Sequence, residues 1–160
     1  MQPTFGKRLY PSLRAFLRDL QFILQRRSKI KQLMKSQVVD AAFRERLMLA
    51  VTEVNGCRYC SYYHTRLALS AGVTQEEVSG IAAQSFEHCP PGQQAALLYA
   101  QHWAESEANP DPDLRRQFLT RYGEGPGEQI ELSLRMIRVG NLTGNLLDYL
   151  LFKLSFGRIR

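Results

Sequence analysis

The positions of the prolines constrain the fold of this chain more than any other sequence feature. All seven prolines lie outside the stretches in which apolar residues recur every three or four positions. Proline lacks an amide hydrogen and breaks the interior of a helix, so a helical protein must place its prolines in this way. No stretch shows the period of two that is typical of a strand. The sequence therefore predicts an all-α bundle of about six to seven helices.

Apolar periodicity and the breaks between periodic stretches define the expected helices. They cover about residues 12–34, 39–54, 57–70, 74–84, 91–103, 112–122 and 128–151. Asn55 and Gly56 end the second of these helices, because both residues tolerate the left-handed backbone conformation. Thr74 and Glu77 form a capping box that begins the fourth. We expect residues 124–127 to form a loop before the long closing helix.

Length and charge both indicate one main domain with a basic N-terminal extension. A chain of 160 residues can bury a hydrophobic core without a structural metal or a disulfide scaffold. Residues 1–37 hold nine Lys and Arg against one acid, Asp19, whereas residues 38–160 carry 12 basic and 14 acidic side chains. We predict a basic, amphipathic helical extension over residues 1–37 and a helical domain over residues 38–160.

The cysteine count and the apolar pattern favour a reduced, intracellular location. The three cysteines, Cys57, Cys60 and Cys89, are too few for a secreted disulfide framework. The first ten residues are not followed by an apolar stretch that resembles a signal peptide. The apolar run 146–152 is interrupted by Asp148 and is much shorter than the roughly 20 residues of a spanning helix. The expected location is the cytoplasm.

The strongest chemical pattern lies between Glu45 and Gly72. A bare C-x2-C pair is a weak signal, but here Cys57 and Cys60 are followed by His64. A helix turns about 100° per residue, so these three residues share one face of a common helix. Cys57 would begin that helix, where free amides and the positive end of the helix dipole favour a thiolate.

Glu45 joins this group if the helices on either side of Asn55 and Gly56 form an antiparallel hairpin. At about 1.5 Å per residue, Glu45 and His64 then both lie roughly 12 to 16 Å from the turn. The result is a carboxylate beside an imidazole beside a thiol. Such a relay can take a proton from Cys60 and return one to a leaving group.

This pattern resembles the carboxymuconolactone decarboxylase-like superfamily and, within it, the alkylhydroperoxidase D branch. The resemblance rests on Glu45, on the sequence N-G-C-R-Y-C at residues 55–60 and on His64, and extends more loosely over about residues 40–150. It implies an all-helical homo-oligomer that reduces hydroperoxides. By this resemblance Cys60 attacks the hydroperoxide and becomes a sulfenic acid, and Cys57 then closes a disulfide with it. Glu45 and His64 match the proton-relay positions.

The resemblance also implies a dithiol partner, lipoyl-linked in the best-known members, that reduces the disulfide. It implies no metal and no organic cofactor, since the thiols carry the electrons themselves. Tyr59 stands where well-characterised peroxidase members carry a second histidine, and a phenol cannot replace an imidazole as a base at neutral pH. An alternative is therefore a disulfide oxidoreductase or thiol sensor with weak peroxidase activity. Decarboxylation is disfavoured, because decarboxylase members of the superfamily lack the C-x2-C pair.

A zinc site is a further alternative for the cysteine pair. Cys57, Cys60 and His64 supply three ligands, whereas a closed structural site needs four. The spare candidates are His88 with Cys89, or His102, and we expect these three residues to be structural or exposed.

Several residues near the motif have a structural interpretation beside the functional one. Glu53 is a candidate second acid, but we expect a solvated residue near a helix end. Tyr62 and Tyr63 either line a substrate pocket or belong to the core or a subunit contact. Asn141 and Asn145 are expected to hydrogen-bond across a helix interface. On the same helix, Gly140 and Gly144 lie four residues apart, a spacing that lets another helix approach closely.

The basic N-terminal helix suggests a function of another class, a binding module for anionic lipid or nucleic acid. Aromatic residues are not interleaved among its basic residues as they are in stacking platforms for nucleic acids. We therefore expect its apolar face to pack on the body or on a sister subunit, with the arginines in solvent. Binding to nucleic acid or to a membrane surface is not favoured.

Overall fold

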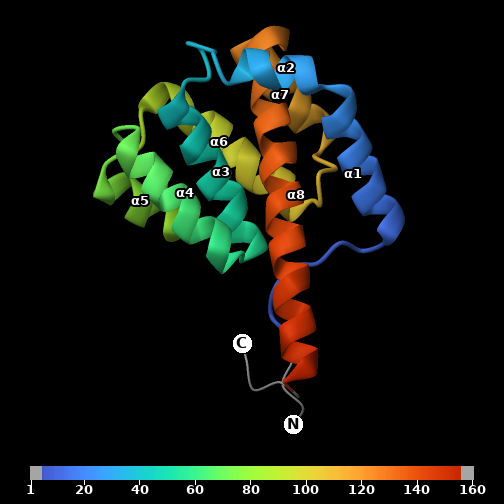
Figure 1. Ribbon diagram of the computed structural model, residues 1–160. Coiled ribbons are helices and arrows are strands. Elements are labelled where there is room, and N and C mark those ends of the chain that lie inside the picture. The colour runs from blue at the N-terminus through green and yellow to red at the C-terminus, as the bar shows by residue number, and fades with distance from the viewer. Residues whose placement is uncertain (1–4, 156–160) are drawn as a thin grey trace.

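The computed structural model describes residues 5–155, which form eight α-helices and no strand. The helices are α1 (Leu13–Gln25), α2 (Arg27–Leu33), α3 (Ala41–Asn55), α4 (Arg58–Ser70), α5 (Gln75–Ala82), α6 (Pro91–Glu105), α7 (Pro112–Tyr122) and α8 (Glu124–Leu154). Figure 1 shows the long α8 between α3 to α6 on one side and α1 on the other. None of these eight helices is long and apolar enough to cross a membrane. The all-α prediction is confirmed, with one helix more than expected.

Local sequence signals set most of the helix ends as predicted. The capping box of Thr74 and Glu77 is present at the start of α5. Gly56 ends α3 with a φ of 70°, in the left-handed region that favours glycine. Cys57 then caps the N-terminus of α4. The turn between α3 and α4 therefore takes only two residues and brings the two helices together as a hairpin.

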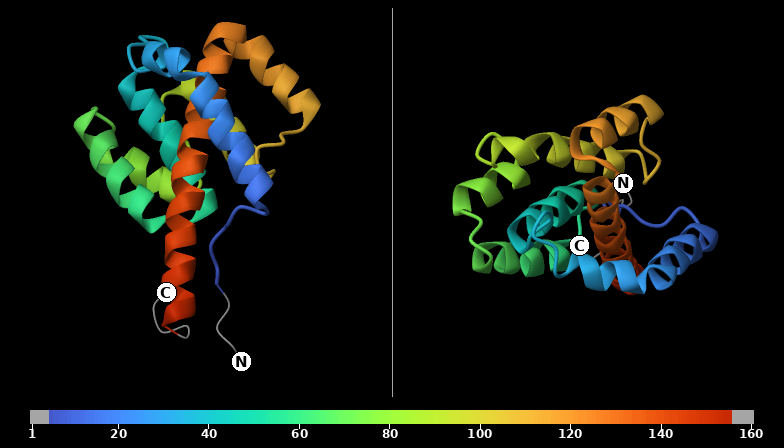
Figure 2. Two further views of the ribbon diagram at one scale, coloured as in Figure 1. Left: turned by 45° about the vertical axis from the view of Figure 1, so that its right-hand side comes forward. Right: turned by 90° about the horizontal axis from the view of Figure 1, so that it is seen from above.

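The single helix expected over residues 12–34 is wrong, because the chain forms α1 and α2 with a break at Arg26. The amide of Arg26 donates to the carbonyl of Ile23 at 3.1 Å, which tightens the end of α1. The break changes the direction of the chain (Figure 2) and lets Leu33 of α2 become fully buried. Apolar periodicity continues through Arg26, so the sequence pattern gave no sign of it.

The loop expected over residues 124–127 is also wrong, because these residues form the first turn of α8. Pro126 is the third residue of the helix. The first amides of a helix have no acceptor within it, so a proline there removes no hydrogen bond. The amide of Gly127 already donates to the carbonyl of Gly123 at 2.9 Å.

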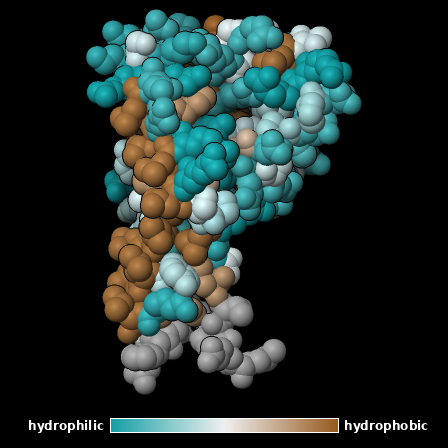
Figure 3. Space-filling model, turned by 90° about the vertical axis from the view of Figure 1, so that its right-hand side faces the viewer, coloured by the Kyte–Doolittle hydropathy of each residue, from teal (hydrophilic) through white to brown (hydrophobic). Residues whose placement is uncertain are grey.

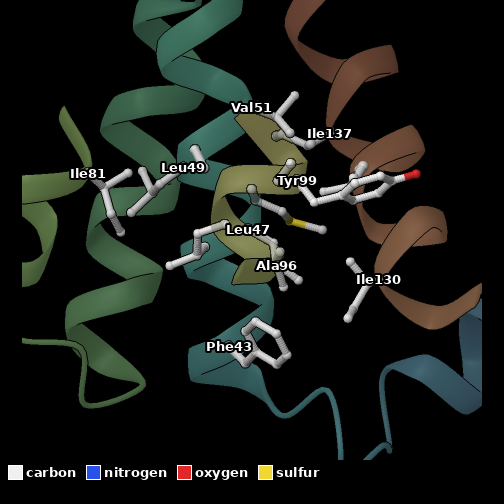
Figure 4. Close-up of a cluster of buried hydrophobic side chains, with 14 of the residues drawn as sticks. Phe43, Leu47, Leu49, Val51, Ile81, Ala96, Tyr99, Ile130 and Ile137 are labelled. Atoms are coloured by element: carbon white, nitrogen blue, oxygen red, sulfur yellow. The ribbon is translucent and has the colours of Figure 1, made fainter. Parts of the chain in front are cut away.

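The hydrophobic core surrounds α3, which packs on α4, α5, α6 and α8. Figure 4 shows buried side chains from four of these helices converging in this region: Phe43, Leu47, Leu49, Val51, Ile81, Ala96, Tyr99, Ile130 and Ile137. Because α3 is held on several sides, its C-terminal end has a fixed position. The α3–α4 turn follows this end directly, so the position of Cys57 in the turn is fixed as well.

The N-terminal helices pack on α8. Asp19 of α1 is buried and accepts hydrogen bonds from Arg135 at 2.7 Å and from Arg138 at 2.9 Å. Ala15 and Asp19 are the buried residues of α1. Phe22 of α1 packs against the core, whereas Leu13, Leu17 and Leu24 are exposed, because the buried ion pair attaches the helix through its other face. Of the two expectations for the apolar face, packing on the body does not hold for these three leucines, and packing on a sister subunit stays a prediction. The predicted boundary after residue 37 falls between α2 and α3.

Candidate active site

Cys57 and Cys60 lie at the beginning of α4 and are joined by a disulfide. Their Cα atoms are 5.4 Å apart, within the usual range for a disulfide. The amide of Cys60 also donates to Cys57 Sγ at 3.4 Å. Cys57 Sγ therefore sits where a helix N-terminus presents an unpaired amide, and this position stabilises a thiolate.

The two sulfurs differ in how far solvent can reach them. Cys57 is only 1% exposed, whereas Cys60 is partly exposed. Gly144 of α8 lies against the disulfide, and a Cβ at this position would be 2.9 Å from Cys57 Sγ. The sulfur of Cys57 thus occupies the space that a side chain at residue 144 would fill. The spacing of Gly140 and Gly144 indicated a close helix contact, but it did not indicate that the contact is with the cysteine pair.

Glu45 and His64 meet across the α3–α4 hairpin. Glu45 Oε2 lies 2.7 Å from Nδ1 of His64, and the Glu45 side chain is buried. A carboxylate only accepts hydrogen bonds, so Nδ1 carries the proton and Nε2 of the neutral ring is free to accept one. The sequence predicts that these two residues lie at the same level of the hairpin, and the structure brings them into contact.

An apolar pocket of about 350 Å³ opens beside the cysteine pair. Its lining comes from α3, α4 and α8: Met48, Tyr59, Cys60, Tyr63, His64, Met136, Ile137 and Gly140. Cys60 and His64 therefore share one opening, with Glu45 behind the imidazole. A small molecule in this pocket meets the sulfur of Cys60, the imidazole ring and otherwise mostly apolar side chains.

Tyr59, on the wall of this pocket, is held by a residue that the sequence analysis did not select. Its hydroxyl donates to Asp148 Oδ1 of α8 at 2.8 Å. Arg58 donates to the same oxygen at 2.8 Å, and Lys7 forms an ion pair with Oδ2. Burial opposes the charge of Asp148, but the hydrogen bonds from Lys7 and Tyr59 and the charges of Lys7 and Arg58 outweigh it and lower the pKa of Asp148. The only sequence signal was an acid within an apolar run.

Buried amides fix α8 against the α3–α4 turn. Asn141 donates to Thr52 Oγ1 at 3.0 Å and accepts from Asn55 at 3.1 Å. Asn145 donates to the carbonyl of Asn55 at 2.7 Å and to that of Arg8 at 2.9 Å. The prediction that Asn141 and Asn145 bond across a helix interface is confirmed. These bonds hold Gly144, which lies between them in sequence, at the cysteine pair.

A family model described as "Carboxymuconolactone decarboxylase family" matches residues 26–105, which is half of the chain. The chain belongs to the carboxymuconolactone decarboxylase family. The match contains Glu45, both cysteines of the pair and His64, whereas α8 with Gly144 and Asp148 lies outside it. The resemblance to the superfamily is confirmed at this level. Searches of curated proteins and of solved structures found no match.

Glu53 was expected to be solvated near a helix end, but its side chain is only partly accessible to solvent. It is partly buried and accepts a hydrogen bond from Ser61 of α4 at 3.2 Å. Burial raises the pKa of its carboxyl group, although the bond from Ser61 acts in the opposite direction. Of the two neighbouring tyrosines, Tyr63 lines the pocket, whereas Tyr62 is 67% exposed and lies outside it.

The remaining cysteine and histidines are structural or exposed, as predicted. Cys89 is a buried free thiol, and burial raises its pKa. His102 Nε2 accepts the amide hydrogen of Asp111 at 3.1 Å, and His88 is exposed. Residues 5–155 contain no group of three or more His, Cys, Asp or Glu side chains that could hold a metal ion.

Proposed function

We propose that this carboxymuconolactone decarboxylase family member is a thiol-dependent peroxidase of the alkylhydroperoxidase D type, in which Cys60 and Cys57 form the redox pair. The observation that carries the proposal is the joint position of three features. A disulfide spans the first turn of α4, its outer sulfur opens to an apolar pocket, and a Glu45–His64 pair lies at the same pocket. The cysteine pair also favours thiol chemistry over decarboxylation.

The reaction begins with the reduced pair. His64 Nε2 takes the proton of the Cys60 thiol, and the hydrogen bond to Glu45 stabilises the imidazolium that forms. The Cys60 thiolate attacks the terminal oxygen of the hydroperoxide and the O–O bond breaks. The alkoxide receives the proton from His64 and leaves as an alcohol, while Cys60 becomes a sulfenic acid.

The disulfide closes in the second step. The sulfur of Cys57 attacks the sulfur of the Cys60 sulfenic acid, an S–S bond forms, and the hydroxide leaves as water with the proton of the Cys57 thiol. Cys57 needs little movement, because its Cα is 5.4 Å from that of Cys60. The amide of Cys60 supports the attacking thiolate.

Burial gives the reduction of the disulfide a direction. Cys57 is 1% exposed, so a thiolate of the dithiol partner attacks Cys60 and forms the mixed disulfide there. Cys57 leaves as a thiolate at the N-terminus of α4, where it is stabilised. The second thiol of the partner then attacks its own sulfur in the mixed disulfide, which releases reduced Cys60 and the oxidised partner.

Stopped-flow mixing of the fully reduced protein with cumene hydroperoxide tests this function. We expect one peroxide to consume two thiols, and we expect Cys60→Ser to abolish rapid consumption. His64→Ala is expected to slow it by about 100-fold or more, the usual contribution of a general base. Cys89→Ser is the matched control, because Cys89 is a buried thiol outside the pocket. Rapid consumption by Cys60→Ser would show that the nucleophile is assigned wrongly.

The direction of reduction is tested separately with variants that keep one cysteine of the pair. Cys57→Ser leaves Cys60 at the pocket, and we expect it to accumulate a mixed disulfide with an acyclic aromatic disulfide, which has no second thiol to release Cys60. Cys60→Ser leaves the buried Cys57, which we expect to react much more slowly. Equal rates for the two variants would contradict attack at Cys60.

A second candidate function is disulfide exchange with little peroxidase activity. Tyr59 favours it, because its hydroxyl proton is donated to Asp148 and the residue offers no base at the pocket. The two functions are separated by comparing the rate of thiol oxidation by the peroxide with the rate of oxidation by a small disulfide. A cytoplasmic location and a lipoyl-linked dithiol partner stay predictions.

A further inference from the structure

Tyr59 forms the side of the pocket next to the cysteine pair. The residue is 44% exposed and lines the pocket together with Cys60. Its Cδ2 atom lies 3.9 Å from the position that a Cβ at Gly144 would take, and Cys60 Sγ lies at the same distance from that position. The ring of Tyr59 and the outer sulfur are therefore neighbours at the surface of α8.

Asp148 and Arg58 hold the side chain of Tyr59 in place. The hydroxyl of Tyr59 donates to Asp148 Oδ1 at 2.8 Å. Arg58 Nη2 donates to the same oxygen at 2.8 Å and to the hydroxyl of Tyr59 at 3.0 Å. The guanidinium group of Arg58 also lies over the Tyr59 ring, with Cζ 4.9 Å from the ring centroid. Ordering an exposed side chain costs conformational entropy, and these contacts order the ring before a reactant arrives.

Asp148 is itself fixed, because the N-terminal segment supplies a second cation to it. The side chain of Asp148 is 3% exposed, and Lys7 forms an ion pair with Oδ2. The amide of Arg8 donates to the carbonyl of Asn55 at 3.4 Å, and Asn145 donates to the carbonyl of Arg8 at 2.9 Å. Residues 7 and 8 are thus attached to both the α3–α4 turn and α8, and they bring Lys7 to Asp148.

The sequence of α8 directs a single charge toward this site. Between residues 139 and 152 Asp148 is the only charged residue. Figure 3 shows a hydrophobic band along one side of the molecule, and Leu146 and Leu150 of α8 are exposed. Both leucines lie on the opposite side of the helix from Asp148, since a helix turns about 100° per residue. The carboxylate therefore points inward, where Tyr59 is one of the groups that bind it.

A fixed ring gives the pocket an apolar wall that exists before a reactant enters. The lining of the pocket is mostly apolar, and Cys60 and His64 supply its reacting groups. A reactant whose reacting atom meets the sulfur of Cys60 places its remaining atoms against the neighbouring side chains, and the Tyr59 ring is next to that sulfur. Contact with a side chain that is already ordered avoids the cost of ordering it, so such contact favours reactants with an apolar group. Hydrogen peroxide has no apolar group to make this contact.

We propose that Tyr59 is a specificity-determining residue, whose fixed ring makes Cys60 select reactants with an apolar group over small polar ones, and that Asp148 is its positioning residue. The inference rests on the proposed function for the kind of reactant, an organic hydroperoxide. The position of the ring is a property of the pocket and acts on any reagent that reaches Cys60. The selectivity can therefore be measured with a reaction other than the reduction of a peroxide.

Alkylation of the reduced protein measures this selectivity. With N-benzyl-iodoacetamide and with iodoacetamide, the thiolate of Cys60 displaces iodide and forms an S–C bond, so the two reagents differ only in the benzyl group. The ratio of their rate constants at Cys60, determined by peptide mass spectrometry, cancels any change in the thiolate fraction. We expect Tyr59→Ala to lower this ratio about tenfold or more, the usual effect of a lost apolar contact in a pocket. Tyr62→Ala is the matched control, because Tyr62 is 67% exposed and does not line the pocket.

Variants of the hydrogen bond separate the role of Asp148 from that of the ring. Tyr59→Phe keeps the ring and removes its bond to Asp148, and we expect the ratio to fall roughly two- to tenfold, the cost of ordering one side chain. Asp148→Ala is expected to have the same effect, whereas Asp148→Asn keeps an oxygen that can accept from Tyr59 and should restore much of the ratio. In the Tyr59→Ala background, Asp148→Ala should cause no further change. Circular dichroism verifies that each variant is folded.

Stopped-flow rates with cumene hydroperoxide and hydrogen peroxide complete the test, and we expect their ratio to fall in the same variants. An alkylation ratio that Tyr59→Ala leaves unchanged would overturn the inference, even if the wild type consumes cumene hydroperoxide rapidly. An equally large effect of Asp148→Ala with and without the Tyr59 ring would overturn the positioning role. A wild type that selects the benzyl reagent through Tyr59 but consumes neither peroxide would support the inference and contradict the proposed function. Each proposal can therefore fail alone.

Discussion

Replacing Gly144 with alanine tests the packing that defines the active site. The added Cβ would lie 2.9 Å from Cys57 Sγ, and 3.9 Å from both Cys60 Sγ and Cδ2 of Tyr59. Ordinary contacts of a Cβ begin at 3.4 Å, so the sulfur or α8 must move by about 0.5 Å. Neither moves easily, because the sulfur belongs to a disulfide and buried amides hold α8.

Two opposing effects set the size of the change in stability. Overpacking in a core costs roughly 1 to 3 kcal/mol. Alanine in place of glycine within a helix stabilises by about 1 kcal/mol. Gly140→Ala is the matched control, because it lies one turn earlier on α8 and its Cβ meets no atom within 4 Å. The gain in helix propensity is the same in both variants, so the difference between their free energies of unfolding equals the overpacking cost of roughly 1 to 3 kcal/mol.

Urea unfolding of the oxidised proteins measures this difference. We expect Gly140→Ala to unfold at a higher urea concentration than the wild type and Gly144→Ala to be less stable than Gly140→Ala by the amount above. Oxidation of the reduced pair should also be slower in Gly144→Ala, because the sulfur of Cys57 is displaced. Equal free energies of unfolding for the two alanine variants would show that the Cys57 sulfur does not pack against Gly144, and the reasoning would be refuted.

Three further predictions concern carboxyl groups. Asp148 has a lowered pKa, so its carboxylate stabilises the fold fully above the ordinary Asp pKa of about 3.9, and this stabilisation is lost as the pH falls through the lowered value. We expect Asp148→Asn to lower the free energy of unfolding in urea by roughly 1 to 3 kcal/mol at pH 7 and by less in acid. Burial raises the pKa of Glu53, so the folded state loses stability as the pH rises and this carboxyl group must become charged inside the protein. Glu53→Gln should therefore be more stable than the wild type at pH 7 and lose this advantage in acid, whereas Glu87→Gln, at an exposed position, should change little. Glu45→Gln removes the carboxylate that accepts from His64, and we expect peroxide consumption to slow about tenfold or more with little change in the free energy of unfolding. An unchanged rate would show that Glu45 takes no part in the proton relay.

The contact between Glu45 and His64 was predictable because it needs only two helices and one tight turn. Gly56 adopts a left-handed conformation, which folds α4 back along α3, and the rise per residue then sets both residues at one level. The pairing of Cys57 with Cys60 is more local still, since only two residues lie between them at the first turn of α4. What stayed open was which side of each helix faces the pocket, and packing against α8 settles that.

The contacts of α8 with the site were not predictable from the pattern. Asp148 binds Lys7 across 141 positions of sequence, and Gly144 meets the cysteine pair from another helix. No periodicity or capping signal connects such residues. The break at Arg26 is of the same kind, because local propensity continues through it and the packing of Leu33 and Asp19 determines it.

The sequence by itself determined where most helices begin and end, and which side chains share a face, because caps, turns and helical periodicity act within about four residues of each other. Three features were decided only by the tertiary structure. Gly144 of α8 covers the sulfur of Cys57, the buried Asp148 accepts a hydrogen bond from Tyr59, and three leucines of α1 are exposed. Those outcomes depend on how eight helices fill one core together, and in such packing each contact is set by all the others.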